Sequence, residues 1–463
     1  MICSRRQEAL ALFIVLIHIV QEVTMDHSTC FKEFIKYASL NVLGMIGLSC
    51  YILADTFFIS KGLGTRGLAA LNLAIPVYSF IHGSGMMLGI GGATKYSINR
   101  NQHRHSQTMP DLIFTHTLCL GAVLALMFFL AGLFLSQAVT SLLGADREVF
   151  EMTNTYLKVI LLFAPAFILN DIMVCFVRNA KDPRRSMLAM TGGSMANIVL
   201  DYIFIFPLDM GIFGAVLATG LAPLISLTIL SGHWLGKKNG FHLTSPAPEL
   251  PLVRYILSLG FPSLITEVSS GIVIIVFNTI ILNLQGNVGV AAYGVVANLS
   301  LVVLSIFTGI AQGIQPLISR AYGYNKPEEI RLVFRYAFIS VLAVSCLLYA
   351  GIFLGAGSIT SIFNSEHNPQ LQMIAETGLR LYFTAILFAG FNIIVAIYFT
   401  STERALPAHA VSMLRGLILI IPTAFFLSAL WGITGVWLAF PATELITALL
   451  GGVIYIKQHS DTL

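Results

Sequence analysis

Five acidic residues lie inside long apolar stretches of this 463-residue chain: Asp55, Asp171, Asp201, Glu267 and Glu444. A carboxylate in a helix surrounded by lipid is costly, and it usually faces a cavity or a partner side chain. Such carboxylates can take up and release a proton or a sodium ion. Cation binding is therefore the first chemistry that the sequence suggests.

Asp55 and Asp201 are expected at similar depths in their helices. Asp201 lies in the apolar stretch that follows Arg185, and Asp55 lies in the one that follows Lys36. At a rise of about 1.5 Å per residue, the two acids lie roughly 24 and 28 Å from these basic ends of the helices. Both acids then fall in the outer half of the first group of helices.

Three neutral polar residues are placed to join the two acids. Asn197 precedes Asp201 by four residues, so the two share one face of a helix. Thr219 lies about 12 Å inside its own apolar stretch, and Asn170 lies near the middle of another. We expect Asp55, Asn170, Asn197, Asp201 and Thr219 to form one cation site, taking H+ or, at the two carboxylates, Na+. The alternative is that these groups make only structural hydrogen bonds between helices.

Glu267 and Glu444 are expected near the middle of the membrane in two different helices. Glu267 lies in the apolar stretch that follows Arg254, and Glu444 lies between Gly432 and Lys457. They either form a second polar site or are two separate acids, each satisfied by its own neighbours.

The remaining ionisable groups in apolar stretches carry less weight. Asp171 faces a different direction from Asn170 and is interpreted as structural. His82 and His116 have no partner at metal-ligand spacing, so neutral imidazoles that are packed or satisfied by a hydrogen bond are favoured. The six cysteines form no Cys-x-x-Cys pair and are interpreted as small packing residues.

The composition indicates which elements must position these groups. The chain is 56% hydrophobic and 10% charged, whereas soluble domains carry roughly 25% charged residues. A spanning helix needs about 20 apolar residues. Five stretches contain no Asp, Glu, Lys or Arg: 67–94, 112–145, 210–236, 268–319 and 416–443. The longest must hold two helices, divided near Asn283–Asn287, and the sequence predicts an all-α polytopic membrane protein.

Several function classes are excluded on the same grounds. The formal net charge of +4 does not indicate nucleic-acid binding, because the basic residues lie in loops between apolar stretches. The nucleotide-binding pattern G-x-x-x-x-G-K-[ST] is absent, and no catalytic or metalloenzyme motif appears. We expect no enzyme activity and no bound cofactor other than the coupling ion.

Twelve spans with short connections are expected. They cover about 35–60, 68–93, 111–137, 155–178, 186–207, 210–235, 253–284, 289–318, 333–357, 378–402, 408–430 and 433–456. With a cytoplasmic N-terminus, 21 of the 26 Lys and Arg residues fall inside, and only Lys61, Arg66, Arg147, Lys158 and Arg380 fall outside. Because basic residues favour cytoplasmic loops, both termini are predicted to be cytoplasmic.

The two halves of the chain resemble each other. GLGTRGLAALNLAIP at 62–76 matches LQGNVGVAAYGVVAN at 284–298, and GIFGAV at 211–216 matches GITGVW at 432–437. Asp55 corresponds to Asn278 and Asn170 to Asn392, so that all four matches share nearly the same offset along the chain. Six helices per repeat give both halves the same orientation, related by an axis along the membrane normal.

The repeat predicts a division of the chain into five parts. These are an N-terminal segment at 1–34, a first six-helix lobe at 35–236, a cytoplasmic linker at 237–252, a second lobe at 253–457 and a tail at 458–463. The apolar run Ala9–Val20 is too short to span comfortably and is either signal-like or interfacial. We favour a true start at Met25, so that residues 1–24 lie upstream of it.

The chain resembles the multidrug and toxic compound extrusion (MATE) family over about residues 30–457. The resemblance is carried by ADTFFISKGLG at 54–64, FVRNAKDPR at 176–184, NIVLDYIFIF at 197–206, GIFGAVLATG at 211–220, FPSLITEVSSGI at 261–272 and GIQPLISRAYGYN at 313–325. The pattern is similar to that of bacterial members with a cation site in the first lobe.

The resemblance implies a plasma-membrane antiporter, expected to be a monomer, that exports amphiphilic and cationic small molecules in exchange for H+ or Na+. It also implies that Asp55, Asn170, Asn197, Asp201 and Thr219 match the cation-site residues, and that Glu267 matches an acid found in the seventh helix of many members. The acid known in the tenth helix of one subgroup is not evident, since that span offers only Asn392 and, near its outer end, Glu376. Lys61 and the extended N-terminus also depart from the usual pattern.

Two other transporter classes are weighed against this one. A flippase for lipid-linked precursors, from the same superfamily, is expected to line its cavity with several arginines, whereas only Arg178 and Arg415 approach the spans here, near their cytoplasmic ends. A major-facilitator transporter is expected to carry G-x-x-x-D-R-x-G-R-R between spans two and three, where this chain has KYSINRNQHRHSQTMPD.

Overall fold

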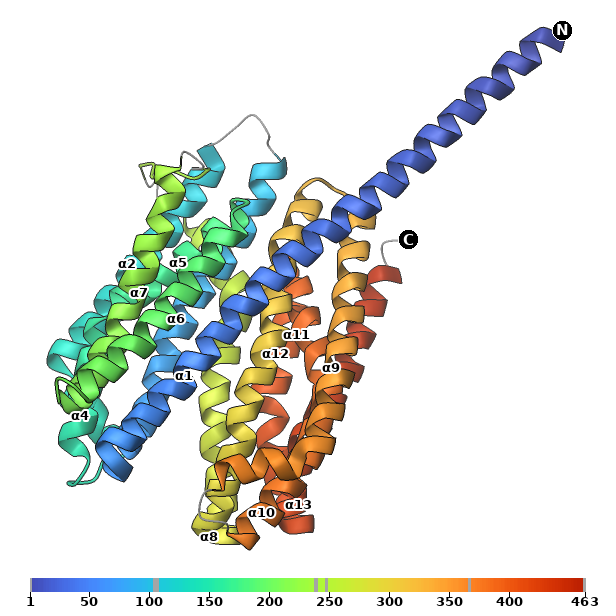
Figure 1. Cartoon of the computed structure of the whole chain (residues 1–463). Coiled ribbons are helices and arrows are strands. Elements are labelled where there is room, and N and C mark those ends of the chain that lie inside the picture. Colours follow the sequence, from blue (N-terminus) through green and yellow to red (C-terminus); the bar gives the residue numbers. More distant parts are fainter. Residues whose placement is uncertain (1, 103–107, 237–239, 246–248, 365–367, 461–463) are drawn as a thin grey trace.

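The computed structural model describes residues 2–102, 108–236, 240–245, 249–364 and 368–460; for residues 2–27 and 459–460 it describes only the helical backbone. All regular elements in this part of the chain are helices (Figure 1). They are α1 (Ile2–Gln102), α2 (Thr108–Phe134), α3 (Ser136–Leu142), α4 (Phe150–Leu162), α5 (Ala164–Asn179), α6 (Pro183–Ile205), α7 (Gly211–Leu235), α8 (Leu250–Gly323), α9 (Pro327–Phe363), α10 (Pro369–Tyr382), η1 (Phe383–Ala385), α11 (Ile386–Ser401), α12 (Ala405–Met413), η2 (Leu414–Ile418) and α13 (Ile420–Ser460).

Three of these helices, α1, α8 and α13, are each broken at a glycine. The breaks are at Gly64 in α1 (φ 65°, ψ −157°), Gly286 in α8 (φ 64°, ψ −158°) and Gly432 in α13 (φ 57°, ψ −134°). Side-chain-bearing residues rarely adopt positive φ, so glycine is the residue that allows these reversals. The break at Gly286 lies within the region predicted to divide 268–319.

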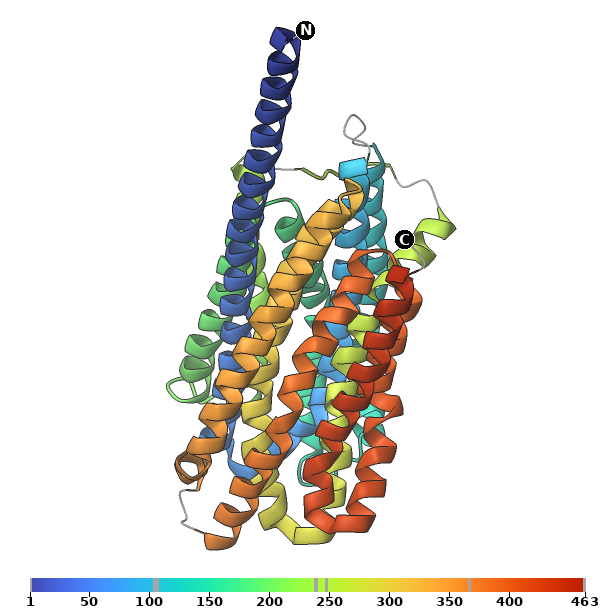
Figure 2. The same cartoon turned by 90° about the vertical axis from the view of Figure 1, so that its right-hand side faces the viewer.

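Counting each broken helix as two spans gives the predicted number. The described residues contain eight helices, or groups of helices, long and apolar enough to cross a membrane, and α4 and α5 form one more span bent by 48°. Dividing three of the eight at their glycine breaks yields twelve crossings. In Figures 1 and 2, the start of α1 and the end of α13 lie at the same end of the protein, as an even number requires.

The sequence repeat is also present in the backbone. Gly64 and Gly286 occupy matching positions of the two repeats and have nearly the same φ and ψ. Gly211 and Gly432, which begin the second pair of matched segments, both have positive φ, at 60° and 57°. The matched segments therefore make the same turns at the same places in the two halves.

The helices form two bundles that converge at one end and diverge at the other (Figure 1). One contains α1 to α7 and the other α8 to α13, and the first part of α1 lies along the boundary between them. One cluster of buried apolar side chains lies mainly within residues 59–256, and a second includes most of the C-terminal half together with Phe34 and Tyr37 of α1. The three glycine breaks lie at the diverging end, as the course of α1, α8 and α13 in Figure 1 shows.

Close contacts hold the bundles together at the converging end, where the basic loops lie. A Cβ on Gly313 of α8 would lie 2.8 Å from Cα of Ala38, which is too close for any residue but glycine. Lys95 of α1 pairs with Glu403 at 2.7 Å, and Gln315 donates to Thr94 Oγ1 at 2.9 Å. This end is closed by both packing and polar contacts.

The N-terminal segment continues into the first span. Helix α1 begins at Ile2 and passes Met25 without a break, and its first part projects beyond the bundles in Figure 2. The start at Met25 stays a prediction.

Candidate functional site

Four of the five predicted cation-site residues meet in the first bundle. Asp55 comes from α1, Asn197 and Asp201 from α6, and Thr219 from α7. All four are buried: Asp201 and Asn197 are 0% exposed, Thr219 4% and Asp55 6%. The four-residue spacing of Asn197 and Asp201 places both on the face of α6 that turns away from lipid.

Asn197 connects the acid to α7. In the amide orientation that satisfies both of its polar groups, Nδ2 donates to Asp201 Oδ2 at 3.0 Å and Oδ1 accepts from the backbone N–H of Thr219 at 3.2 Å. We assign this orientation because the opposite one would point the amide oxygen at a carboxylate. Asn197 thus fixes one oxygen of Asp201 and leaves the other available.

Each of the two carboxylates has an acceptor atom that no hydrogen bond uses. Oδ1 of Asp55 and Oδ1 of Asp201 are both buried and have no hydrogen-bond partner, and the two groups are close enough to interact electrostatically. Among the ion pairs recorded for the described residues, none includes either acid. Buried polar groups are normally paired, so this site has the oxygen donors and negative charge that a hard cation or a proton requires.

Tyr156 of α4 extends this cluster, although sequence reasoning did not identify it. It is 3% exposed, its hydroxyl lies against Thr219, and it interacts electrostatically with Asp55 and Asp201. A tyrosine in an apolar helix gives no sequence signal of such a role, because most buried tyrosines simply pack.

Asn170 lies on α5, and no recorded hydrogen bond of the described residues joins it to Asp55 or Asp201. Its side-chain oxygen is nevertheless buried without a partner. Its neighbour Asp171 accepts from or donates to His82 Nδ1 at 2.9 Å, according to the protonation of the two groups. His82 and Asp171 are 89 residues apart, so local sequence spacing gave no sign of this pair. The prediction of a packed or satisfied imidazole did not name Asp171 as the partner.

Glu267 joins the His82–Asp171 pair from the other bundle. It lies on α8 and interacts electrostatically with both His82 and Asp171. Its Cβ would approach a Cβ on Gly83 to within 3.1 Å, which shows how closely α8 passes α1 here. The ring of Tyr78 stacks on His82.

Glu444 has entirely different neighbours, within the second bundle. Its Oε1 accepts from Arg415 Nε at 3.0 Å and lies 2.9 Å from Arg415 Nη2, and its Oε2 accepts from Asn392 Nδ2 at 2.6 Å. No recorded contact of the described residues links Glu267 to Glu444. Of the two predicted arrangements, the structure favours two separate acids over one shared site.

Of the two arginines placed near cytoplasmic ends by sequence, Arg178 is buried and Arg415 is largely covered, with 12% of its side chain exposed. Arg415 lies in the π-helical turn η2 and neutralises Glu444. Arg178 is 0% exposed and donates from Nη1 to Asn41 Oδ1 at 2.9 Å and to Gln312 Oε1 at 2.8 Å. The sequence placed Arg178 at the loop end of an apolar stretch. In the structure, Asn41 and Gln312 hold its guanidinium between the bundles.

The donor set of the Asp55–Asp201 cluster fits a proton or Na+ better than a transition metal. In the described part of the chain, no three His, Cys, Asp or Glu side chains come together in a group that could hold a metal ion. Two carboxylates and amide or hydroxyl oxygens are the ligands that hard monovalent and divalent cations accept.

Comparison with known proteins decides the family. The family model MatE matches residues 42–203 and 262–426, which together are more than half of the chain. The chain belongs to the MatE family. The two matched segments begin at positions 42 and 262, an offset close to that of the internal repeat.

Relatives and solved structures agree with this family along almost the whole chain. The chain is 25% identical to multidrug export protein MepA of Staphylococcus saprophyticus over 441 residues, covering 95% of this chain and 96% of that protein. It is 24% identical to MepA of Staphylococcus haemolyticus over 443 residues, with the same two shares. The crystal structure of MATE in complex with MaL6 matches with a TM-score of 0.86 at 25% identity, covering 93% of this chain and 96% of that one.

A further structure supports the fold alone. An outward-facing multidrug resistance MATE family transporter of the MOP superfamily gives a TM-score of 0.85 at 23% identity, covering 93% of this chain and 96% of that one. The family match and the multidrug export relatives make this MatE protein a multi-pass membrane transporter and not an enzyme. The major-facilitator alternative is set aside.

Proposed function

We propose that this MatE protein is a secondary active multidrug exporter, in which H+ or Na+ enters through the Asp55–Asp201 cluster while an amphiphilic, cationic small molecule leaves. The observation that carries the proposal is the pair of buried carboxylates with unpartnered oxygens and, among the recorded ion pairs of the described residues, no basic partner. The relatives described as multidrug export proteins support the substrate class.

The coupling follows from the position of the cluster between three helices. Two like charges on α1 and α6 repel each other in a buried site, and binding of a cation relieves that repulsion and draws α1, α6 and α7 together. An ion drives transport only if it binds the two conformations with different affinities. The cluster meets this requirement when the packing of these helices differs between the drug-binding and drug-releasing states.

Orientation and organisation complete the proposal. The basic, converging end faces the cytoplasm, which makes this conformation open on the outer side and puts both termini inside. The protein acts as a monomer in the plasma membrane. The lobe at 35–236 carries the ion site, 237–252 is the linker, and 253–457 is the second lobe. Cysteines introduced at Arg66 and Lys326 test the orientation: an impermeant reagent should label only position 66 in intact cells.

The contacts of Arg178 and Arg415 argue against the flippase alternative. Arg178 is bonded to neutral side chains between the bundles, and Arg415 is neutralised by Glu444. Neither guanidinium is available to hold a pyrophosphate in this conformation.

The proposal is tested in everted vesicles that contain the transporter and a fluorescent cationic drug. Drug uptake should follow an imposed proton gradient alone or an imposed sodium gradient alone. Asp201→Asn should abolish the driven component, whereas Asp209→Asn, at an exposed position outside the bundles, serves as the matched control. Uptake in Asp201→Asn vesicles at the control rate would rule out this cluster and leave Glu267 as the candidate.

A further inference from the structure

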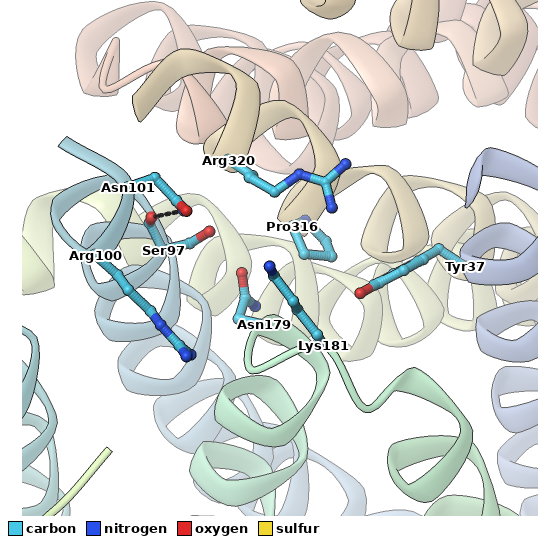
Figure 3. Close-up of a pocket in the computed structure, with 8 residues that line it drawn as sticks. All are labelled: Tyr37, Ser97, Arg100, Asn101, Asn179, Lys181, Pro316 and Arg320. Carbon is cyan, nitrogen blue, oxygen red and sulfur yellow. Dashed lines mark hydrogen bonds between the residues drawn. The ribbon is translucent and has the colours of Figure 1, made fainter. Parts of the chain in front are cut away.

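A small pocket lies between the two bundles at their converging end (Figure 3). Tyr37 and Ser97 come from the two segments of α1, Asn179 and Lys181 from the turn between α5 and α6, and Arg320 from α8. In Figure 3, the ammonium group of Lys181, the guanidinium of Arg320 and the hydroxyl of Tyr37 point toward the same space. The pocket is therefore lined by hydrogen-bond donors from both bundles.

The charge in this pocket is only partly balanced. Arg320 pairs with Glu33 and, at 3.4 Å, with Glu329. Lys181 and Arg100, a further lining residue, have no carboxylate within ion-pair distance among the pairs recorded for the described residues. Arg100 instead donates to the hydroxyl of Tyr96 at 2.6 Å.

Asp182, next in the chain to Lys181, does not neutralise it. Its carboxylate lies 3.2 Å from His233 Nδ1 and 3.5 Å from Arg185 Nε, on the side of α6 and α7. The positive charge of Lys181 at the pocket is therefore not compensated by Asp182.

A buried charge behind the pocket adds to the positive field. Arg178 is 0% exposed, bonds only to neutral groups and has an Nε without a partner. A buried cation is normally compensated by an anion. Asn179, which follows it, donates to Gln315 Oε1 at 2.8 Å and so ties this turn to α8.

The backbone holds Lys181 at the pocket at a cost. Its φ is 69°, the left-handed region that glycine or asparagine usually occupies. The amide of Asp182 donates to the carbonyl of Val177 at 3.2 Å and fixes the turn. Residues kept in such conformations cluster at binding sites, where the surrounding structure maintains the strain.

We propose that this inter-bundle pocket binds the phosphate group of an anionic ligand, with Lys181 and Arg320 as its cationic contacts. The enclosed space is about 10 Å³, room for one water-sized atom such as a phosphate oxygen, and the rest of the group sits at the open mouth beside the exposed Lys181. Ammonium and guanidinium groups are the usual partners of phosphate oxygens. The phosphate belongs either to an anionic lipid headgroup or to a soluble phosphate compound.

The ligand has a mechanical consequence because its contacts come from both bundles. It binds best when the bundles are together at this end, so it stabilises the present conformation by its difference in affinity between conformations. The site is separate from the Asp55–Asp201 cluster and does not depend on how export is coupled.

The first experiment measures thermal unfolding of the purified full-length protein in nanodiscs of phosphatidylcholine. Inorganic phosphate, titrated at constant ionic strength, should raise the unfolding midpoint saturably if the ligand is soluble. If the ligand is a lipid, phosphatidylglycerol in the nanodisc should raise the midpoint and free phosphate should not. Either result supports the pocket, and no shift with either probe overturns it.

The variants decide whether the shift comes from this pocket. Lys181→Gln should weaken the apparent affinity for the effective probe about tenfold, as expected for the loss of one charge-assisted contact. Lys61→Gln, at an exposed lysine of α1 near the diverging end, should leave it unchanged. Lys181→Gly relieves the backbone strain, so it should fold at least as well and still lose the response. An undiminished response in both Lys181 variants would contradict the proposal.

The bridging role has its own readout. Spin labels at Arg66 and Asn287, beside the breaks in α1 and α8, report the separation of the bundles at the diverging end. In the protein that retains Lys181, binding of the effective probe should shift the distribution of label-to-label distances toward larger values. In Lys181→Gln, the distribution should stay unchanged. An unchanged distribution despite demonstrated binding would remove the bridging role.

Discussion

The first and second bundles carry an asparagine at the same position of the repeat, Asn170 and Asn392, but they treat their buried acids differently. In the first bundle, Asp55 and Asp201 each keep an oxygen without a partner. In the second, Glu444 is held by Arg415 and by Asn392. The backbone plan is shared, so the difference lies in the side chains.

This difference indicates which of the two bundles can bind an external cation. A carboxylate already neutralised by a guanidinium inside the protein gains little from another cation, whereas two unpaired carboxylates gain a great deal. The repeat therefore provides one bundle with a charge that can be exchanged and the other with a charge that is fixed. The following variants either break this distinction or sharpen it.

The largest effect is expected from neutralising the acids of the first bundle. Asp201→Asn keeps the side-chain volume and removes the exchangeable charge, so gradient-driven export should fall to background while the protein still folds and binds drug. Asp55→Asn should behave similarly. The double variant should be little worse than either single variant, because both remove the same step. Export rates in vesicles and drug binding in detergent would be compared.

Removing the fixed cation of the second bundle should instead damage stability. Arg415→Met leaves Glu444 buried without its charge partner, which typically costs about 3–5 kcal/mol. The thermal unfolding midpoint should fall sharply. Adding Glu444→Gln to the same chain should restore much of the loss, since no charge then remains unpaired. A single variant as stable as the wild type would show that Glu444 can find another cation, and the two bundles would then be more alike than the structure indicates.

The repeat-related asparagines should separate stability from ion binding. Asn392→Ala removes a 2.6 Å hydrogen bond to a buried carboxylate, with an expected cost of about 1.5–3 kcal/mol for a bond to a charged group. Asn170→Ala removes an oxygen that has no partner and a single hydrogen bond from its amide to Asp171, so the free energy of unfolding should fall by less, about 0.5–1.5 kcal/mol. If Asn170 contributes to the cation site, its variant should still require a higher ion concentration for export. Unfolding curves and ion titrations of the two variants measure both quantities.

Much of this fold was predictable because lipid imposes strong rules. Runs of apolar residues fix the spans, and the matched segments predicted the repeat that appears as paired glycine breaks at Gly64 and Gly286. The convergence of Asn197, Asp201 and Thr219 followed from helical spacing and depth. These features depend on periodicity along one helix or on equality between halves, both of which a single sequence displays.

The contacts that were missed depend on how helices rotate against each other. The pairing of His82 with Asp171 and the burial of Arg178 between Asn41 and Gln312 join segments 89 to 137 residues apart. No spacing rule links such residues. Tyr156 and Glu267 were placed by the same tertiary packing, so the neighbours of each acid could be named only from the structure.

The smallest effect, and one that should be equal in the two bundles, concerns the breaks themselves. Gly64 and Gly286 have φ near 65° and ψ near −158°, a region essentially restricted to glycine. A Cβ at either position would meet no atom within 4 Å, so the cost of Gly64→Ala or Gly286→Ala is backbone strain alone, roughly 1–2 kcal/mol. The two unfolding midpoints should fall by the same amount, and export per folded molecule should persist in both. Unequal losses would mean that the bundles differ in backbone as well as in their acids, and the comparison would have to extend to the breaks.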